Sequence, residues 1–110
     1  MILIADSGST KTDWRLCYQG AAIQSIQTQG INPYHQTEEA IEQVLAEELL
    51  PQLIQNPEFT SQHSVEVIFY GSGCANETAC NRVKEAILKT LCTDNITIHS
   101  DLLGAARALC

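Results

Sequence analysis

The sequence predicts an α/β domain in which a mixed five-stranded sheet carries helices on its faces. Short apolar runs alternate with longer segments in which apolar residues recur at helical spacing. A tight Gln19-Gly20 connection between two early runs indicates an antiparallel hairpin, because glycine supplies the positive φ that such turns need. The predicted element order is β-β-β-α-β-α-β-α, and the 110 residues are about the length of one domain.

Three predicted strands precede the first helix. Met1–Ala5 is a short apolar run that ends at the polar turn Ser7-Gly8-Ser9-Thr10, so we expect a buried strand. Asp13–Tyr18 alternates, and one of its faces carries Trp14, Leu16 and Tyr18. Ala21–Thr28 alternates less regularly and is predicted as the third strand.

The first predicted helix follows a loop over Gly30–Tyr34. Thr37 precedes two glutamates and is the expected N-cap, because acidic residues in the first turn favour a helix start there. The apolar residues at helical spacing are Ala40, Ile41, Val44, Leu45 and Leu49. Pro51 should end or kink this helix, because proline lacks the N–H that a helix interior needs. Residues 55–64 are polar and predict a loop.

The second half of the chain continues the alternation. Val65–Tyr70 is apolar without interruption, which is typical of an interior strand. A helix over Asn76–Leu91, a strand over Ile96–His99 and the start of a helix over Asp101–Leu109 complete the order. Ligands of open α/β sheets bind beyond the carboxyl ends of the strands. We therefore expect a site in the polar segments 6–12, 71–76 and 100–104.

Composition excludes several classes of partner. Six Lys and Arg against thirteen Asp and Glu give a net charge of −7, which argues against nucleic acid or an anionic membrane surface. No apolar run approaches the roughly 20 residues of a membrane-spanning helix. The five cysteines form no C-x-x-C pair, so we expect free thiols and a cytoplasmic location rather than a disulfide framework or a zinc site. Cys17 and Cys92 are expected to be small core residues.

Residues 6–13, Asp-Ser-Gly-Ser-Thr-Lys-Thr-Asp, could bind an anion. Gly8 would let the backbone approach a ligand, and successive N–H groups in such a turn can surround an anion. Hydroxyl donors and a positive charge would come from Thr10, Thr12 and Lys11. Asp6 could hold Mg²⁺ directly or through water. The alternative is a polar hairpin turn that binds nothing.

Residues 5–14 resemble the first phosphate motif of the actin/Hsp70/sugar-kinase superfamily. More narrowly, they are similar to the BadF/BadG/BcrA/BcrD-type ATPase family, which includes N-acetylglucosamine kinases. Residues 30–33 and 71–76 stand where those kinases have sugar-binding loops, and residues 100–106 resemble the segment with their catalytic aspartate. The resemblance extends over essentially the whole chain.

The resemblance implies a ribonuclease H-like, actin-like ATPase fold. Family members have two such domains with a nucleotide cleft between them, and they bind ATP with Mg²⁺. The kinases transfer the γ-phosphate to a sugar hydroxyl, and an N-acetylglucosamine-like substrate is expected here. Residues 1–110 would form the N-terminal half, inactive alone and able to form a homodimer, while the family's second phosphate loop and adenosine motif would lie in another domain. A one-domain relative that never closes a cleft is the alternative.

The resemblance also implies roles for single residues. Nucleotide contacts would come from Asp6, Gly8, Ser9, Thr10, Lys11 and Thr12, and Asp6 would hold the Mg²⁺. Sugar contacts would come from Asn32, Ser72, Gly73 and Asn76. Asp101 would be the general base, or alternatively a helix N-cap. Asn32 could equally belong to an ordinary Asn-Pro turn, and Asn76 could equally cap the helix after it.

Two other functions compete with the kinase. One is a non-kinase ATPase of the same family, similar to activators of acyl-CoA dehydratases that hold an iron–sulfur cluster with cysteines. Those activators have a Glu and a His in the last segment, where this sequence has Asp101 and no following His. The other is a binding domain without catalysis.

Overall fold

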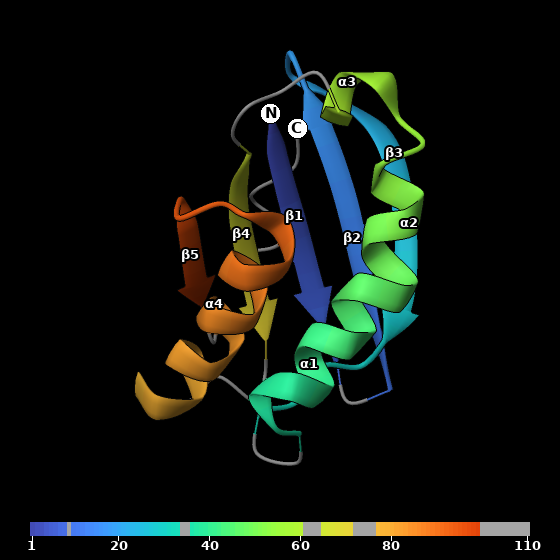
Figure 1. The fold of residues 1–110 in the computed structure, drawn as a ribbon. Coiled ribbons are helices and arrows are strands. Elements are labelled where there is room, and N and C mark those ends of the chain that lie inside the picture. The colour runs from blue at the N-terminus through green and yellow to red at the C-terminus, as the bar shows by residue number, and fades with distance from the viewer. Residues whose placement is uncertain (9, 34–35, 61–64, 72–76, 100–110) are drawn as a thin grey trace.

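Five strands form one mixed sheet in the order β3-β2-β1-β4-β5 (Figure 1). The structure is a computed structural model that describes every residue except 9, 34–35, 61–64, 72–76 and 100–110. The strands are β1 (Ile2–Ser7), β2 (Lys11–Tyr18), β3 (Ala21–Gln29), β4 (Glu66–Gly71) and β5 (Ile96–His99). The first three are antiparallel neighbours, whereas β4 pairs parallel with both β1 and β5. The predicted mixed sheet and the interior position of β4 are therefore confirmed.

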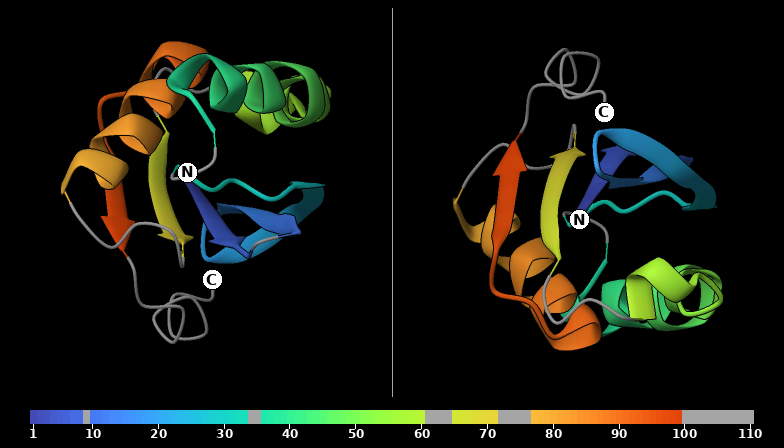
Figure 2. Two further views of the ribbon diagram at one scale, coloured as in Figure 1. Left: turned by 90° about the horizontal axis from the view of Figure 1, so that it is seen from below. Right: turned by 90° about the horizontal axis from the view of Figure 1, so that it is seen from above.

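The helical segments lie between the strands in the predicted order. They are α1 (Glu38–Val44), η1 (Leu45–Leu49), α2 (Leu50–Leu53), α3 (Pro57–Thr60) and α4 (Glu77–Leu91). Figure 2 shows that α1, α2 and α4 all cover the same face of the sheet. In the described part of the chain, helices thus cover one face and not both, and the helix expected over residues 101–109 lies outside the described residues.

The main core lies between this face and the helices. Alternate strand positions point into it because successive side chains of a strand face opposite ways. It contains Leu3, Ala5, Trp14, Leu16, Val67 and Phe69 from the sheet, and Ile41, Leu45, Leu49, Val83 and Ile87 from the helices. The ring centroids of Trp14 and Phe69 lie 6.1 Å apart, and the two rings are tilted relative to each other. A smaller cluster of Ile4, Cys17 and Tyr70 lies on the other face.

The β2–β3 hairpin has the predicted two-residue turn. Gln19 and Gly20 both have positive φ, 53° and 79°, which is the geometry that matches the twist of the flanking strands. The register shifts between Leu16 and Cys17, whose partners on β3 are Gln24 and Ala22. Ile23 is therefore the extra residue of a β-bulge and is exposed. This bulge explains why the apolar alternation of the third strand is irregular.

The sequence predicts that Pro51 ends or kinks the first helix, and the structure shows that it does not end it. The helix continues through α2 to Leu53, and the turn before the proline widens into the π-helix η1, in which the Leu50 amide donates to the Leu45 carbonyl. A widened turn accommodates the proline ring and its missing N–H without breaking the helix.

Two other expectations need correction. The region 55–64 is not only a loop, since Pro57–Thr60 forms the short helix α3. Cys92 is not a core residue: it is exposed and adopts a φ of 55°, because it stands directly after α4 in the left-handed conformation that ends many helices.

The thiol prediction is confirmed for Cys80 and Cys92, neither of which forms a disulfide. It is wrong at Cys17, which is buried and disulfide-bonded. An odd number of cysteines argues against a complete framework but leaves room for a single bridge. Among the helices that the structure describes, none is both long and apolar enough to cross a bilayer.

Candidate functional site

The β1–β2 turn, residues 8–10, lies where the sequence analysis placed an anion site. Ser7 pairs with Thr12 at the strand ends, and the Gly8 amide donates to the Lys11 carbonyl at 2.9 Å, which closes the turn. Gly8 is half-buried, whereas Thr10 and Lys11 are exposed. The predicted Ser9 lies outside the described residues.

Gly8 is not required by the backbone of this turn. Its φ is not in the left-handed region, and a Cβ built on it would meet its nearest atom, the Lys11 carbonyl oxygen, at an ordinary 3.7 Å. A Cβ at Gly8 would therefore fit in ordinary van der Waals contact with the turn. The absence of a side chain at this position is what would let a ligand approach the backbone closely.

Thr12 has a different place from the one predicted. Its side chain is fully buried, and its hydroxyl lies 2.8 Å from the Ser7 hydroxyl and 3.2 Å from the Gln29 carbonyl, to which it can donate. Its hydroxyl therefore points into the protein and not toward the surface of the turn. Ser7 is equally buried, because it continues the inward-facing positions Leu3 and Ala5 of β1.

Asp6 lies at the end of β1 on the face without described helices. It is exposed, and its cross-strand neighbours are Asp13 on β2 and Tyr70 on β4. Asp13 accepts a hydrogen bond from Gln27, and Tyr70 stacks on His99 with ring centroids 5.0 Å apart. Within the described ranges, no three His, Cys, Asp or Glu side chains are grouped to hold a metal ion.

The 30–33 loop, which follows β3, lies beside the β1–β2 turn. The Gly30 amide donates to the Thr10 carbonyl at 3.1 Å, and the Ile31 amide donates to Ser7 Oγ at the same distance. Ile31 is buried, and the next residue, Asn32, is half-buried. The turn and the loop, which the sequence analysis treated as separate ligand segments, are therefore in direct contact.

The loop is also held from its far side. Arg82 of α4 donates a hydrogen bond to the Pro33 carbonyl. The amide of Asn32 donates to the Gln36 side chain at 2.7 Å, and the Gln36 amide donates back to the Asn32 carbonyl at 3.0 Å. This reciprocal pair ties Asn32 to the residue that precedes the Thr37 cap. The loop is therefore anchored directly before α1.

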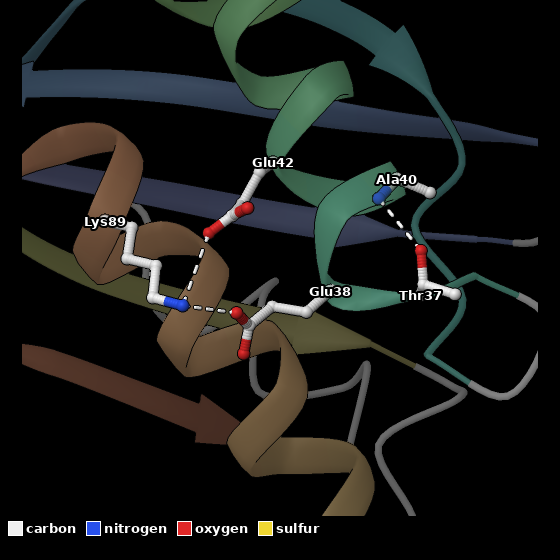
Figure 3. Close-up of polar contacts among 5 residues, drawn as sticks. All are labelled: Thr37, Glu38, Ala40, Glu42 and Lys89. Carbon is white, nitrogen blue, oxygen red and sulfur yellow. Dashed lines mark hydrogen bonds and ion pairs between the residues drawn. The ribbon is translucent and has the colours of Figure 1, made fainter.

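The start of α1 is fixed by its cap and by α4 (Figure 3). Thr37 is the N-cap, as predicted, and its hydroxyl accepts from the Ala40 amide at 3.1 Å. Lys89 of α4 lies 2.5 Å from a Glu38 oxygen and 3.8 Å from a Glu42 oxygen. The hydrogen bond to Glu38, followed by the charges of Glu38 and Glu42, raises the pKa of Lys89 above its ordinary value.

Glu48 binds the last residue of β3, Gln29, directly before the 30–33 loop. Its carboxylate accepts from the Gln29 amide at 2.9 Å and from the Gln29 side chain at 2.5 Å. Glu48 lies in the π-helix η1, so the widened turn near Pro51 also presents this carboxylate to β3. Irregular turns of this kind often occur at functional sites.

The structure thus brings together part of the predicted site. Gly8, Thr10, Lys11 and Asn32 lie on one turn and its neighbouring loop, and Asp6 lies on the adjacent face. Ser72, Gly73, Asn76 and Asp101 lie outside the described residues. The contacts of Ser7, Arg82 and Glu48 were not predicted from the sequence. Only Ser7 had a signal, since its position in the alternation of β1 indicates an inward-facing side chain.

The chain is similar to solved structures. No protein-family model and no curated protein matches the chain. A crystal structure from Porphyromonas gingivalis, described as a putative N-acetylglucosamine kinase, is 43% identical with a TM-score of 0.82. The match covers all of this chain and 38% of that chain. The chain therefore shares its fold with part of this putative kinase. It spans well under half of that protein's length.

Proposed function

We propose that this chain is the N-terminal half of an ATP-dependent sugar kinase and that N-acetylglucosamine is its substrate. The observation that supports this most directly is the match of the whole chain, at 43% identity, to a putative N-acetylglucosamine kinase. The motif of residues 5–14 supports placing it in the BadF/BadG/BcrA/BcrD-type family. The strand order β3-β2-β1-β4-β5 supports a ribonuclease H-like domain.

The phosphates of Mg-ATP are proposed to lie against the β1–β2 turn. Gly8 has no side chain that would keep a phosphate from approaching the backbone, and Thr10 and Lys11 of the same turn are exposed. Ser9 is proposed to contact the phosphates as well. Asp6 would hold the Mg²⁺, which prefers few carboxylates and several waters. Thr12 is buried and would support the turn from below without contacting the phosphates.

The sugar is proposed to lie against the 30–33 loop. Asn32 is half-buried beside the turn, and its amide side chain can donate to and accept from sugar hydroxyls or an acetamido group. Ser72, Gly73 and Asn76 are proposed to contact the sugar as well. Asp101 would take the proton from the attacking hydroxyl as its oxygen bonds to the γ-phosphorus and the bond to ADP breaks.

A second domain would supply the opposite wall of the cleft. The matched kinase chain is much longer than this one, which agrees with that proposal. Adenosine would be held there, and the 110-residue chain alone would catalyse no transfer, because the reaction needs both substrates aligned and shielded from water.

The test is a coupled assay of ADP release by the full-length protein with a panel of hexoses and N-acetylhexosamines. We expect turnover that depends on N-acetylglucosamine. Asp101→Asn should lower it by about 10²–10⁴-fold, as is usual for a lost general base. Asp94→Asn, which changes an exposed carboxylate before β5, is the matched control and should leave turnover unchanged. Absence of sugar-dependent ADP release would contradict the kinase assignment.

A further inference from the structure

Two buried hydroxyl groups connect the β1–β2 turn with the 30–33 loop. Ser7 and Thr12 are 1% and 0% exposed, and their oxygens lie 2.8 Å apart at the paired ends of β1 and β2. Ser7 Oγ accepts from the Ile31 amide and can donate to the Ile31 carbonyl, both at 3.1 Å. Thr12 can donate to the Gln29 carbonyl at 3.2 Å. The two side chains thus contact the backbone on both sides of Gly30.

The two hydroxyl groups have two protons, which can be arranged in two ways. If Thr12 donates to the Gln29 carbonyl, the Ser7 proton is shared between Thr12 and the Ile31 carbonyl. If Thr12 donates to Ser7, the Gln29 carbonyl still accepts from the Thr28 hydroxyl, and Ser7 donates to the Ile31 carbonyl. In each arrangement the Ile31 amide has Ser7 Oγ as its acceptor. Ile31 is only 2% exposed, so water cannot readily replace the serine, and a buried amide without an acceptor is costly.

The contact joins parts of the chain that are far apart in sequence. Ser7 and Ile31 are separated by 24 positions in the sequence. A backbone hydrogen bond from the Gly30 amide to the Thr10 carbonyl also joins the loop to the turn. A shift of the turn on binding a ligand would therefore move the loop. A ligand that orders the loop would likewise order the turn, since coupling between two sites is reciprocal.

We propose that Ser7 and Thr12 are positioning residues that lock the 30–33 loop to the β1–β2 turn and couple the occupancy of one to that of the other. The identity of the two ligands rests on the proposed function, ATP at the turn and sugar at the loop. The mechanical link between the two segments does not depend on that assignment.

The first experiment measures hydrogen exchange of single amides in the full-length protein and needs no activity. In Ser7→Ala we expect exchange of the Ile31 amide to rise at least tenfold, with smaller rises at Gly30 and Lys11. The amides of Val83 and Ile87, in the buried part of α4, should not change, because the lost contact is local. An equal rise at all these positions, or no rise at Ile31, would overturn the proposal.

The second experiment measures the affinity for a non-hydrolysable Mg-ATP analogue with and without saturating N-acetylglucosamine. Coupling factors of about 5–150-fold are typical of linked sites. We expect a factor in this range for the wild type, a factor near one for Ser7→Ala and a reduced factor for Thr12→Val. Thr12→Ser retains the hydroxyl and should restore the wild-type factor. An unchanged factor in Ser7→Ala would overturn the coupling.

The two proposals fail separately. A wild-type protein that binds neither ligand contradicts the kinase assignment, and the exchange of the Ile31 amide still decides the link between turn and loop. If Ser7→Ala does not fold, Thr12→Val is measured in its place, with faster exchange expected at Gly30 and Ile31 and unchanged exchange there counting against the link.

Discussion

Arg82 of α4 donates a hydrogen bond to the backbone carbonyl of Pro33, the residue after Asn32 in the 30–33 loop. A long, charged side chain from a helix near the end of the described chain thus holds a loop near its start. Because the Arg82 side chain is half-buried, its bond to the loop is partly shielded from water.

Replacing Arg82 by methionine should loosen the loop while keeping the side chain's length. Hydrogen bonds to charged groups contribute about 1.5–3 kcal/mol, so we expect the KM for the sugar to rise about tenfold or more, with a smaller effect on the KM for ATP. Steady-state kinetics with each substrate varied in turn measures this. Arg15→Met, which changes an exposed arginine on β2, is the control and should alter neither constant. Equal rises in both KM values would argue against a specific effect on the loop.

Gly8→Ala should separate folding from ligand binding at the β1–β2 turn. A methyl group fits there at an ordinary 3.7 Å, so the free energy of unfolding should change by no more than about 1 kcal/mol. The same methyl group would occupy the space proposed for the phosphates, and the affinity for Mg-ATP should fall about tenfold or more, which corresponds to roughly 1.4 kcal/mol. Calorimetry and chemical denaturation measure the two effects.

Gly20→Ala is the matched control for Gly8→Ala. Gly20 has a φ of +79°, and a Cβ at this position would meet nothing within 4 Å, so alanine there is strained by its backbone alone. We expect a loss of about 1 kcal/mol in stability and unchanged affinity for Mg-ATP. An unchanged affinity in Gly8→Ala would remove the phosphates from this turn.

Cys92→Gly should stabilise the protein. Cys92 adopts a φ of 55° after α4, a conformation that costs a residue with a Cβ about 1 kcal/mol and costs glycine little. Thermal unfolding should therefore show a rise in Tm. Cys92→Ala removes the thiol but keeps the Cβ, so it should not raise Tm, and a rise in both variants would assign the effect to the thiol.

Lys89 predicts a dependence of stability on alkaline pH. Its pKa in the folded protein is raised above 10.5, chiefly by the hydrogen bond to Glu38. A raised pKa means that the folded state binds the proton more tightly. The stabilisation is therefore complete below the unfolded pKa and is lost as the pH rises through the folded pKa. Chemical denaturation should show that the difference between wild type and Lys89→Met is constant from pH 7 to 9 and shrinks above about pH 10.5.

Lys84→Met is the control for this measurement, because Lys84 is an exposed lysine on the same helix. Its stability difference from wild type should not vary with pH in the same way. The effect at Lys89 will be small, since its side chain is 54% exposed and the ion pair is screened by solvent.

The strands, the β2–β3 hairpin and the interior position of β4 could be predicted from the sequence, whereas the order of the strands in the sheet could not. Ile96–His99 was predicted with the bounds that the structure shows, and β4 differs from its prediction by one residue at each end. Both are short runs of β-branched or aromatic residues with clear turn signals beside them. The Gln19-Gly20 turn and the Thr37 cap were also predicted correctly, because each depends on chemistry within a few residues.

The features that were missed depend on distant contacts or on details of backbone geometry. Nothing near Pro51 in the sequence indicates that the preceding turn would widen and keep the helix going. The sequence pattern does not show that the Thr12 hydroxyl is buried, since its burial depends on Ser7 and on the Gln29 carbonyl from another strand. The bond from Arg82 to Pro33 joins positions 49 residues apart, and single-residue patterns carry no signal for it.

The bulge at Ile23 and the carboxylate of Glu48 have a consequence for self-assembly. In the described part of the chain, β3 and β5 are the outer strands of the sheet, where unpaired backbone groups could recruit a strand from another molecule. On β3 the bulge interrupts the regular edge. The Glu48 carboxylate accepts a hydrogen bond from the Gln29 amide, and the Gln24 side chain donates one to the Gln52 carbonyl of α2. On β5 the edge is only four residues long. Copies of this domain are therefore poorly suited to stack edge to edge into extended β-aggregates, even at high concentration.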